Sequence, residues 1–276
     1  MESVLGHLPL ALFTTLGAFG AGGFVAIALA TICGKYSDDE YKGIDKKTLI
    51  PLIIVIVGFI CVAFHVTAPL KAFGVFSGLG RSPLSNEVVY GIVFVVVALI
   101  YTIMAYAGKL GSGARKGFAI VVAILAVIFA VMMGLAYMVS TIPTWCNFGT
   151  VLQMLGYLLA GTSLGFILLP AKDCMAKTLN IVIIVGVVLA AIGLIAQSVI
   201  ASGMTSGLVG GAAYVSAAMP YMIIALALAV IGIVICFIKS EKFAGTGRGV
   251  VISVLFVLAI LFGRLAFYVM QVSIGL

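Results

Sequence analysis

Residues 87–107 read EVVYGIVFVVVALIYTIMAYA, and this stretch decides the fold class. It begins with one glutamate, and every residue after that is uncharged. A transmembrane α-helix needs about 20 predominantly apolar residues to cross a bilayer. Strands of transmembrane β-barrels instead alternate apolar and polar residues over about ten positions. The continuous run therefore predicts a membrane-spanning helix.

The rest of the sequence repeats this pattern. Of its 276 residues, 64% are hydrophobic and 8% are charged, whereas soluble domains carry about 25% charged residues. The predicted spans are 8–33, 49–69, 87–107, 117–139, 149–170, 178–201, 218–238 and 250–271. The predicted fold is an all-α integral membrane protein with eight transmembrane helices, and residues 1–276 form a single polytopic domain. No base precedes the first run, so it reads as a mature helix rather than a cleaved signal.

Two segments suggest an internal repeat. Residues 16–22 read LGAFGAG and residues 155–161 read LGYLLAG. A duplication with parallel halves would divide the sequence into residues 1–140 and 141–276. The alternative is that small residues recur wherever membrane helices pack closely. The sequence leaves both explanations open.

The distribution of bases predicts the orientation. The first, third, fifth and seventh connecting segments carry 12 of the 15 Lys and Arg residues. Such residues concentrate in cytoplasmic loops. We therefore expect a cell-membrane protein with both termini on the outer, periplasmic side. The net charge of +7 reflects these loops and does not indicate nucleic acid binding.

Metal cofactors are not expected in this protein. Its five cysteines are scattered without a C-x-x-C pair, whereas iron–sulfur clusters need grouped thiolates. The two histidines, His7 and His65, lie near the outer ends of their predicted spans rather than at mid-depth. Axial haem ligation needs histidines from facing helices. We expect neither an iron–sulfur cluster nor a haem.

Glu87 is the acid that stands out on the predicted outer side. One interpretation is structural: Ser85 or Asn86 caps the helix, and a carboxylate in the first turn is stabilised by the helix dipole. The other is chemical: Arg81 keeps the carboxylate ionised, and an ionised carboxylate at the membrane edge accepts protons. His65 would return beside Glu87 if the second connecting segment folds as a short re-entrant cap, or it is a structural histidine.

The last predicted span contains a charge within its apolar run. Arg264 either takes part in a site, pairs structurally or extends its charge toward the interface. Tyr268 either binds a ligand or belongs to an interfacial aromatic belt, and the same alternative holds for Trp145.

Six short motifs occur in a characteristic order: PLALFT (9–14), AGGF (21–24), H-x3-PLKAF (65–73), SPLSNE (82–87), TIPTW (141–145) and GRLAFY (263–268). Together they resemble the membrane anchor of the dimethyl sulfoxide reductase type, an eight-helix subunit. The resemblance implies that the anchor holds a molybdopterin catalytic subunit and a four-cluster iron–sulfur subunit on the outer face. It also implies menaquinol oxidation without haem. His65 and Glu87 match positions implicated in quinol binding.

The sequence therefore predicts a quinol-oxidising anchor. Glu87 and His65 are its predicted catalytic residues, and Arg81, Ser85, Arg264 and Tyr268 complete the predicted quinol site, with Lys71 as a further cation. One alternative is the polysulfide or nitrite reductase type of anchor, which is also haem-free. Others are a purely structural anchor and a transporter or proton pump. Proton relays need chains of acids or histidines, which the predicted spans lack.

Overall fold

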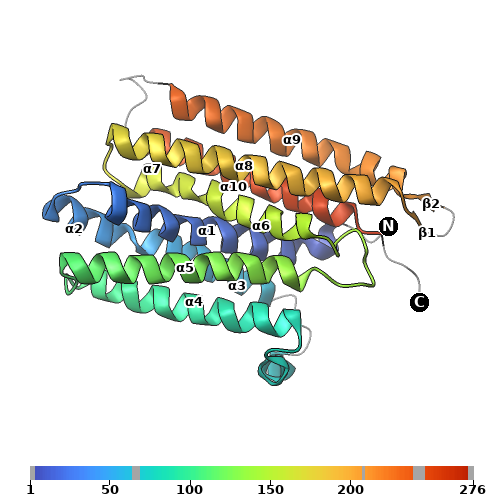
Figure 1. Ribbon diagram of the computed structural model, residues 1–276, viewed down its shortest axis with the longest axis horizontal. Coiled ribbons are helices and arrows are strands. Elements are labelled where there is room, and N and C mark those ends of the chain that lie inside the picture. The colour runs from blue at the N-terminus through green and yellow to red at the C-terminus, as the bar shows by residue number, and fades with distance from the viewer. Residues whose placement is uncertain (1–3, 64–68, 207–208, 239–245, 273–276) are drawn as a thin grey trace.

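The computed structural model describes residues 4–63, 69–206, 209–238 and 246–272 as a bundle of long helices lying side by side (Figure 1). The helices of five turns or more are α1 (Leu8–Cys33), α4 (Pro83–Tyr106), α5 (Ser112–Ala136), α8 (Asp173–Ser202), α9 (Gly211–Phe237) and α10 (Thr246–Val269). The shorter helices are η1 (Val4–His7), α2 (Asp38–Lys47), α3 (Leu49–Ala63), η2 (Pro69–Gly78), α6 (Phe148–Ala160), η3 (Gly161–Leu164) and α7 (Gly165–Leu168). Strands β1 (Thr205–Ser206) and β2 (Val209–Gly210) form a small antiparallel pair.

Eight helical segments in the described part of the protein are long and apolar enough to cross a membrane, which confirms the predicted fold class. Two of them are composite: α2 with α3, and α6 with η3 and α7. Several predicted boundaries are wrong by a few residues. The third span begins at Pro83 rather than at 87.

The segment predicted to connect the first two spans is largely helical. Ser37 and Glu40 form a capping box, in which the Glu40 carboxylate accepts from the Ser37 N–H at 2.7 Å. Acids occupy the first turn of α2, and Lys46 and Lys47 occupy its last turn. This arrangement suits the helix dipole at both ends. The charges that suggested a loop are therefore those of a capped helix leading into α3.

Helix α1 lies at the centre of the bundle and contacts α3, α5, α6 and α10. Its closest approach is to the end of α6, where Gly22 packs against the backbone of Leu158 and Gly161. A β-carbon on Gly161 would lie 2.6 Å from the carbonyl oxygen of Phe19. These glycines belong to the two L-G-x-x-x-A-G segments, so close helix packing accounts for them. The duplication stays a prediction.

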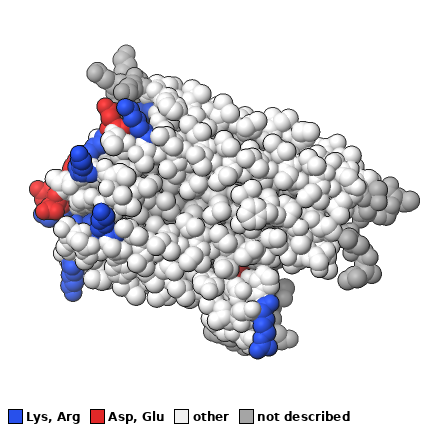
Figure 2. Space-filling model, in the orientation of Figure 1, with Lys and Arg blue, Asp and Glu red and all other residues white. Residues whose placement is uncertain are grey.

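Charged side chains gather at one end of the bundle (Figure 2). We call this the basic end, and ten of its Lys and Arg residues are described: Lys35, Lys42, Lys46, Lys47, Lys109, Arg115, Lys116, Lys172, Lys177 and Arg248. We call the other end, which bears η1, η2 and the β1–β2 pair, the opposite end (Figure 1). The Lys and Arg residues of the first, third, fifth and seventh predicted connecting segments thus lie at the same end of the bundle, as far as they are described.

Candidate functional site

Arg264 of α10 is the most deeply buried charged residue that the structure describes, at 0% exposure. Its Nε donates to Thr14 Oγ1 of α1 at 2.9 Å, and its Nη2 donates to the Tyr268 hydroxyl at 3.0 Å. The guanidinium carbon also lies 4.7 Å from the ring centroid of Tyr137 and 4.2 Å from that of Phe267. Such cation–π contacts strengthen when the charge is desolvated. The interpretation that Arg264 extends toward the interface is therefore wrong.

Aromatic rings enclose this guanidinium at the opposite end of the bundle. The Tyr137 and Tyr268 hydroxyls share a hydrogen bond of 2.5 Å. Trp145 is 7% exposed and stacks on Phe267 with centroids 5.1 Å apart, so it is not a lipid-facing belt residue. His7 stacks on Tyr268 at 5.0 Å with nearly parallel rings. We call Arg264 with these five rings the arginine–aromatic cluster.

Glu87 reaches the interior because of its place on α4. The buried positions of this helix recur every three or four residues, at Glu87, Gly91, Phe94, Ala98, Tyr101 and Ala105. That spacing defines one helix face. Glu87 is the residue of this face nearest the opposite end, and it is the one that carries a charge. Its exposed fraction is 4%. It therefore lies inside the bundle rather than on an exposed rim.

Glu87 and the arginine–aromatic cluster form one electrostatic unit. The charge of Arg264 acts on the Glu87 carboxylate, and Glu87 acts in turn on Tyr137 and Tyr268. Within the described residues, Glu87 Oε1 and Arg264 Nη1 both lack a hydrogen-bond partner. Buried polar atoms are nearly always paired. Each is a buried polar atom left open, and such atoms are candidate contacts for a polar ligand.

The helix-cap assignment near Glu87 is wrong. Ser82, not Ser85 or Asn86, is the N-cap of α4: its hydroxyl accepts from the Ser85 N–H. Pro83 occupies the first turn, so Glu87 belongs to the second turn. Arg81 is exposed, and among the described cations Arg264 is the one whose charge acts on Glu87, so the part of Arg81 in the site stays a prediction. Sequence proximity favoured Arg81, but the fold brings α10 to α4.

The remaining predicted residues fall into four groups. Arg264 and Tyr268 lie one turn apart on α10 and are hydrogen-bonded, and their part in a quinol site stays a prediction. Ser85 is 5% exposed, but it lies two positions before Glu87 and packs against Gly78 at the end of η2. His65 lies outside the described residues, so its placement beside Glu87 stays a prediction. Lys71 lies in η2, beyond the end of α4 (Figure 1).

A buried amide pair behind the cluster was not predicted. Gln153 of α6 donates to the Gln197 Oε1 of α8 at 3.3 Å, and Gln197 donates to the Phe267 carbonyl at 3.0 Å. Both amides are 0% exposed. The sequence contains a signal for this pair, because each glutamine interrupts a predicted apolar span and buried amides need hydrogen-bond partners. Through the Phe267 carbonyl, this amide pair fixes α10 close to Arg264.

The described residues include no group of three or more His, Cys, Asp or Glu side chains that could hold a metal ion. The polar chemistry of this site comes instead from Arg264, Glu87, the two amides and the phenols. These groups bind and position neutral polar ligands, and the carboxylate exchanges protons.

The fold and the site together define a multi-pass membrane protein with a buried, partly unpaired polar site near one end. Residues 1–270 match the family model of the DMSO reductase anchor subunit. The protein therefore belongs to the family of DMSO reductase anchor subunits, and it is a membrane subunit of an oxidoreductase complex.

Curated relatives agree with this family. The sequence is 29% identical to one subunit of the anaerobic dimethyl sulfoxide reductase of Escherichia coli (strain K12), over 97% of this protein and 96% of the relative. It is 31% identical to YnfH, another anaerobic dimethyl sulfoxide reductase subunit of the same strain, over 64% of this protein and 62% of the relative. It is 29% identical to a subunit of the anaerobic dimethyl sulfoxide reductase of Haemophilus influenzae (strain Rd), over 63% of this protein and 62% of the relative.

Proposed function

We propose that this protein oxidises menaquinol beside Glu87 and passes the electrons to an iron–sulfur subunit of a molybdopterin-dependent reductase. The observation that carries the proposal is the pair of unpartnered atoms, Glu87 Oε1 and Arg264 Nη1, in a buried site that the described residues leave incomplete. A quinol has hydroxyl groups that both donate and accept hydrogen bonds. One hydroxyl can donate to Glu87 and accept from Arg264.

The surrounding rings suit a flat aromatic substrate. Tyr137, Phe267 and Tyr268 present faces and edges around the guanidinium. Aromatic pairs gain from stacked and edge-to-face contacts beyond the area that they bury. The site lies within a membrane-spanning bundle, so a lipid-soluble quinol reaches it from the bilayer without crossing water.

The reaction removes two electrons and two protons from the quinol hydroxyls and leaves the quinone. Glu87 accepts a proton from the hydroxyl that it binds, and His65 is the proposed second group for the other hydroxyl. The electrons leave to an iron–sulfur cluster of the partner subunit, which reduces the terminal acceptor. Arg264 holds the oxygen as its O–H bond breaks, because a cation stabilises the negative charge that develops there.

The charge distribution guides the placement of the partners. Ten described bases lie at the basic end, which we assign to the cytoplasmic side. The opposite end then faces outward, and we propose that the iron–sulfur and molybdopterin subunits dock there, close to Glu87. Quinol protons leave to this same side, so this step moves no net charge across the membrane.

A transporter is less consistent with the positions of the acids. Of the acids that the structure describes, Asp38, Asp39, Glu40, Asp45 and Asp173 lie at the basic end, and Glu87 alone lies toward the opposite end. A proton relay needs several such groups in sequence across the membrane.

The test is quinol oxidation by the assembled complex carrying Glu87→Gln with His65→Ala. We expect the rate to fall by about 10²–10⁴, the usual contribution of a positioned proton acceptor. Asp39→Asn is the matched control, because it also converts an acid to its amide but at a side chain 88% exposed at the basic end. Wild-type oxidation by the double variant, with assembly intact, would overturn the proposal. Quinone that co-purifies with the protein would argue against the purely structural alternative, but the rate is the deciding measurement.

A further inference from the structure

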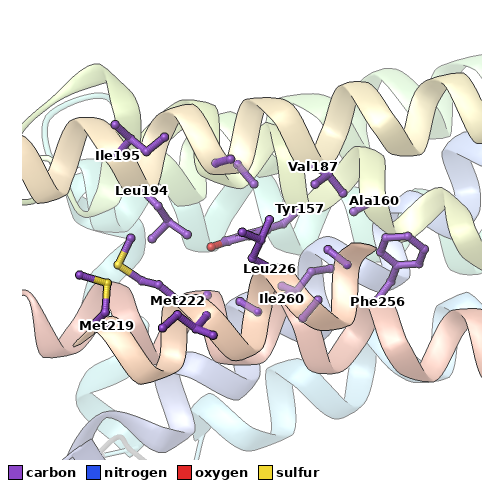
Figure 3. A pocket seen from close by; sticks show the side chains of 17 residues that line it. Tyr157, Ala160, Val187, Leu194, Ile195, Met219, Met222, Leu226, Phe256 and Ile260 are labelled. Atoms are coloured by element: carbon purple, nitrogen blue, oxygen red, sulfur yellow. The ribbon is translucent and has the colours of Figure 1, made fainter. Parts of the chain in front are cut away.

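A cavity of about 270 Å³ lies between α6, α8, α9 and α10. Small residues create it: Ala160, Ala190, Ala191, Ala225, Ala229, Ala259 and Gly263 line its walls. Larger side chains complete the lining, among them Leu194, Met222 and Phe256 (Figure 3). At its rim Ile195, Ile223 and Leu226 are each more than half exposed, so the cavity opens between α8 and α9 toward lipid.

One polar side chain enters this apolar space. Tyr157 reaches in from α6, and its oxygen points toward Leu194 and Met222 (Figure 3). The residue is 3% exposed, and its hydroxyl has no hydrogen-bond partner in the described part of the protein. Gly263 leaves room for it, because a β-carbon there would lie 2.6 Å from the phenol oxygen. Tyrosine hydroxyls usually find a partner when they are buried.

Water does not supply that partner well. A buried water molecule needs two to four polar contacts, and Tyr157 is the one lining residue with a polar side chain. A second hollow of about 300 Å³, lined by residues of α3 and α4, offers the contrast. All the described side chains that line it are apolar, so lipid chains can fill it. The Tyr157 cavity is complementary to an apolar molecule that carries a hydrogen-bond acceptor.

The depth of Tyr157 in the membrane distinguishes two sources of such an acceptor, a phospholipid ester and a free lipophilic molecule. Tyr157 lies nine residues into α6, about 14 Å along the helix from Phe148. The hydrocarbon core is about 30 Å thick, so the backbone of Tyr157 lies near its middle and the phenol lies within it. Phospholipid ester groups lie at the interface, out of reach of this position. A free lipophile with a ring carbonyl reaches it readily.

We propose that this cavity is a second binding site, which takes the ring of an isoprenoid quinone with one carbonyl accepting from the Tyr157 hydroxyl. The volume approaches the lower end of small-molecule pockets, which suits a bicyclic ring and not a two-chain lipid. This inference rests on the cavity and does not depend on quinol oxidation at Glu87.

The test is photolabelling of the full-length protein in nanodiscs of phosphatidylethanolamine and phosphatidylglycerol. The probe is an azido-naphthoquinone with one isoprenyl unit, and labelled peptides are mapped. We expect label on the cavity-lining parts of α8 and α9. Ala225→Leu should abolish this label by filling the cavity, whereas Ala227→Leu, at an exposed position of the same helix, should not change it. Tyr157→Phe should weaken probe binding by roughly tenfold through loss of one hydrogen bond.

The outcomes separate the two proposals. Glu87→Gln should leave the α8 and α9 label unchanged, so failure of quinol oxidation at Glu87 would not remove it. Absence of this label in the wild-type protein would overturn the second site, as would equal labelling of the Ala225→Leu variant. A diazirine-bearing phospholipid that labels the same peptides and resists displacement by unlabelled naphthoquinone would also overturn it.

Discussion

Two buried arginines occupy opposite ends of this protein, and they are satisfied in different ways. Arg115 at the basic end makes three hydrogen bonds to the Asp45 carboxylate, the shortest at 2.9 Å, and lies over the Tyr41 ring. Neither Arg115 nor Asp45 has a buried nitrogen or oxygen without a partner among the described residues. Arg264 instead bonds hydroxyls and faces rings, while Glu87 remains unpaired at Oε1. The ion pair at the basic end joins two helices, whereas the charged groups with unpaired atoms at the opposite end have capacity left for a ligand.

The largest expected effect tests whether the closed pair is structural. Asp45→Ala leaves Arg115 buried without its counter-charge, and we expect a loss of about 3–5 kcal/mol in stability. Thermal unfolding in detergent measures this loss. Quinol oxidation per assembled complex should stay at the wild-type level, because the pair lies at the other end from Glu87.

A double substitution sharpens this test. Replacing both partners, as Asp45→Leu with Arg115→Met, removes the two charges together. Apolar replacements of buried pairs are often neutral or stabilising. We therefore expect the double variant to unfold at a higher temperature than Asp45→Ala. Equal instability of the two variants would instead show that loss of the pair itself, and not the unpaired charge of Arg115, causes the destabilisation.

The next effect is on activity at the open site. Arg264→Met keeps the length of the side chain but removes the donor to the quinol oxygen. We expect quinol oxidation to fall by about 10²–10³, the range for loss of a preorganised donor. Arg264→Lys should give an intermediate rate, because an ammonium keeps the charge without the planar fork. A wild-type rate for Arg264→Met in an assembled complex would contradict the site.

A smaller effect is expected from one hydroxyl. Tyr268→Phe keeps the ring stacked on His7 but removes the group that Arg264 and Tyr137 both contact. We expect about a tenfold lower rate, equivalent to one hydrogen bond. Tyr101→Phe is the control, because that hydroxyl is buried and unpartnered in the described structure but belongs to the half of α4 toward the basic end. Equal losses in both variants would indicate general destabilisation.

The smallest effect concerns Arg81. Because this side chain is exposed and Arg264 acts on Glu87, Arg81→Gln should change the quinol oxidation rate by less than about twofold. Rates at low and high salt measure any remaining influence, since exposed charges are screened. A large, salt-dependent loss would restore Arg81 to the site.

The sequence predicted what depends on local composition. Apolar run length located the eight spans, and a charge inside such a run identified Arg264. Contacts across the bundle were less accessible: Thr14 and Arg264 are 250 residues apart, and no local pattern pairs them. The same limit explains why Arg81 was preferred to Arg264 as the partner of Glu87. His7 and Tyr157 were missed as contributors because a ring near a helix end and a phenol in a span are common packing residues.

The 250-residue separation between Thr14 and Arg264 also bears on biogenesis. The first span brings Thr14 into the bilayer early in synthesis, and Tyr137 follows at the midpoint of the sequence. The arginine arrives with the last span, so Thr14 and Tyr137 are already inserted when it enters the membrane. Because of this order of synthesis, the buried charge of Arg264 enters the membrane when its partners from earlier spans are already there. A truncated product that lacks α10 cannot assemble the site at all.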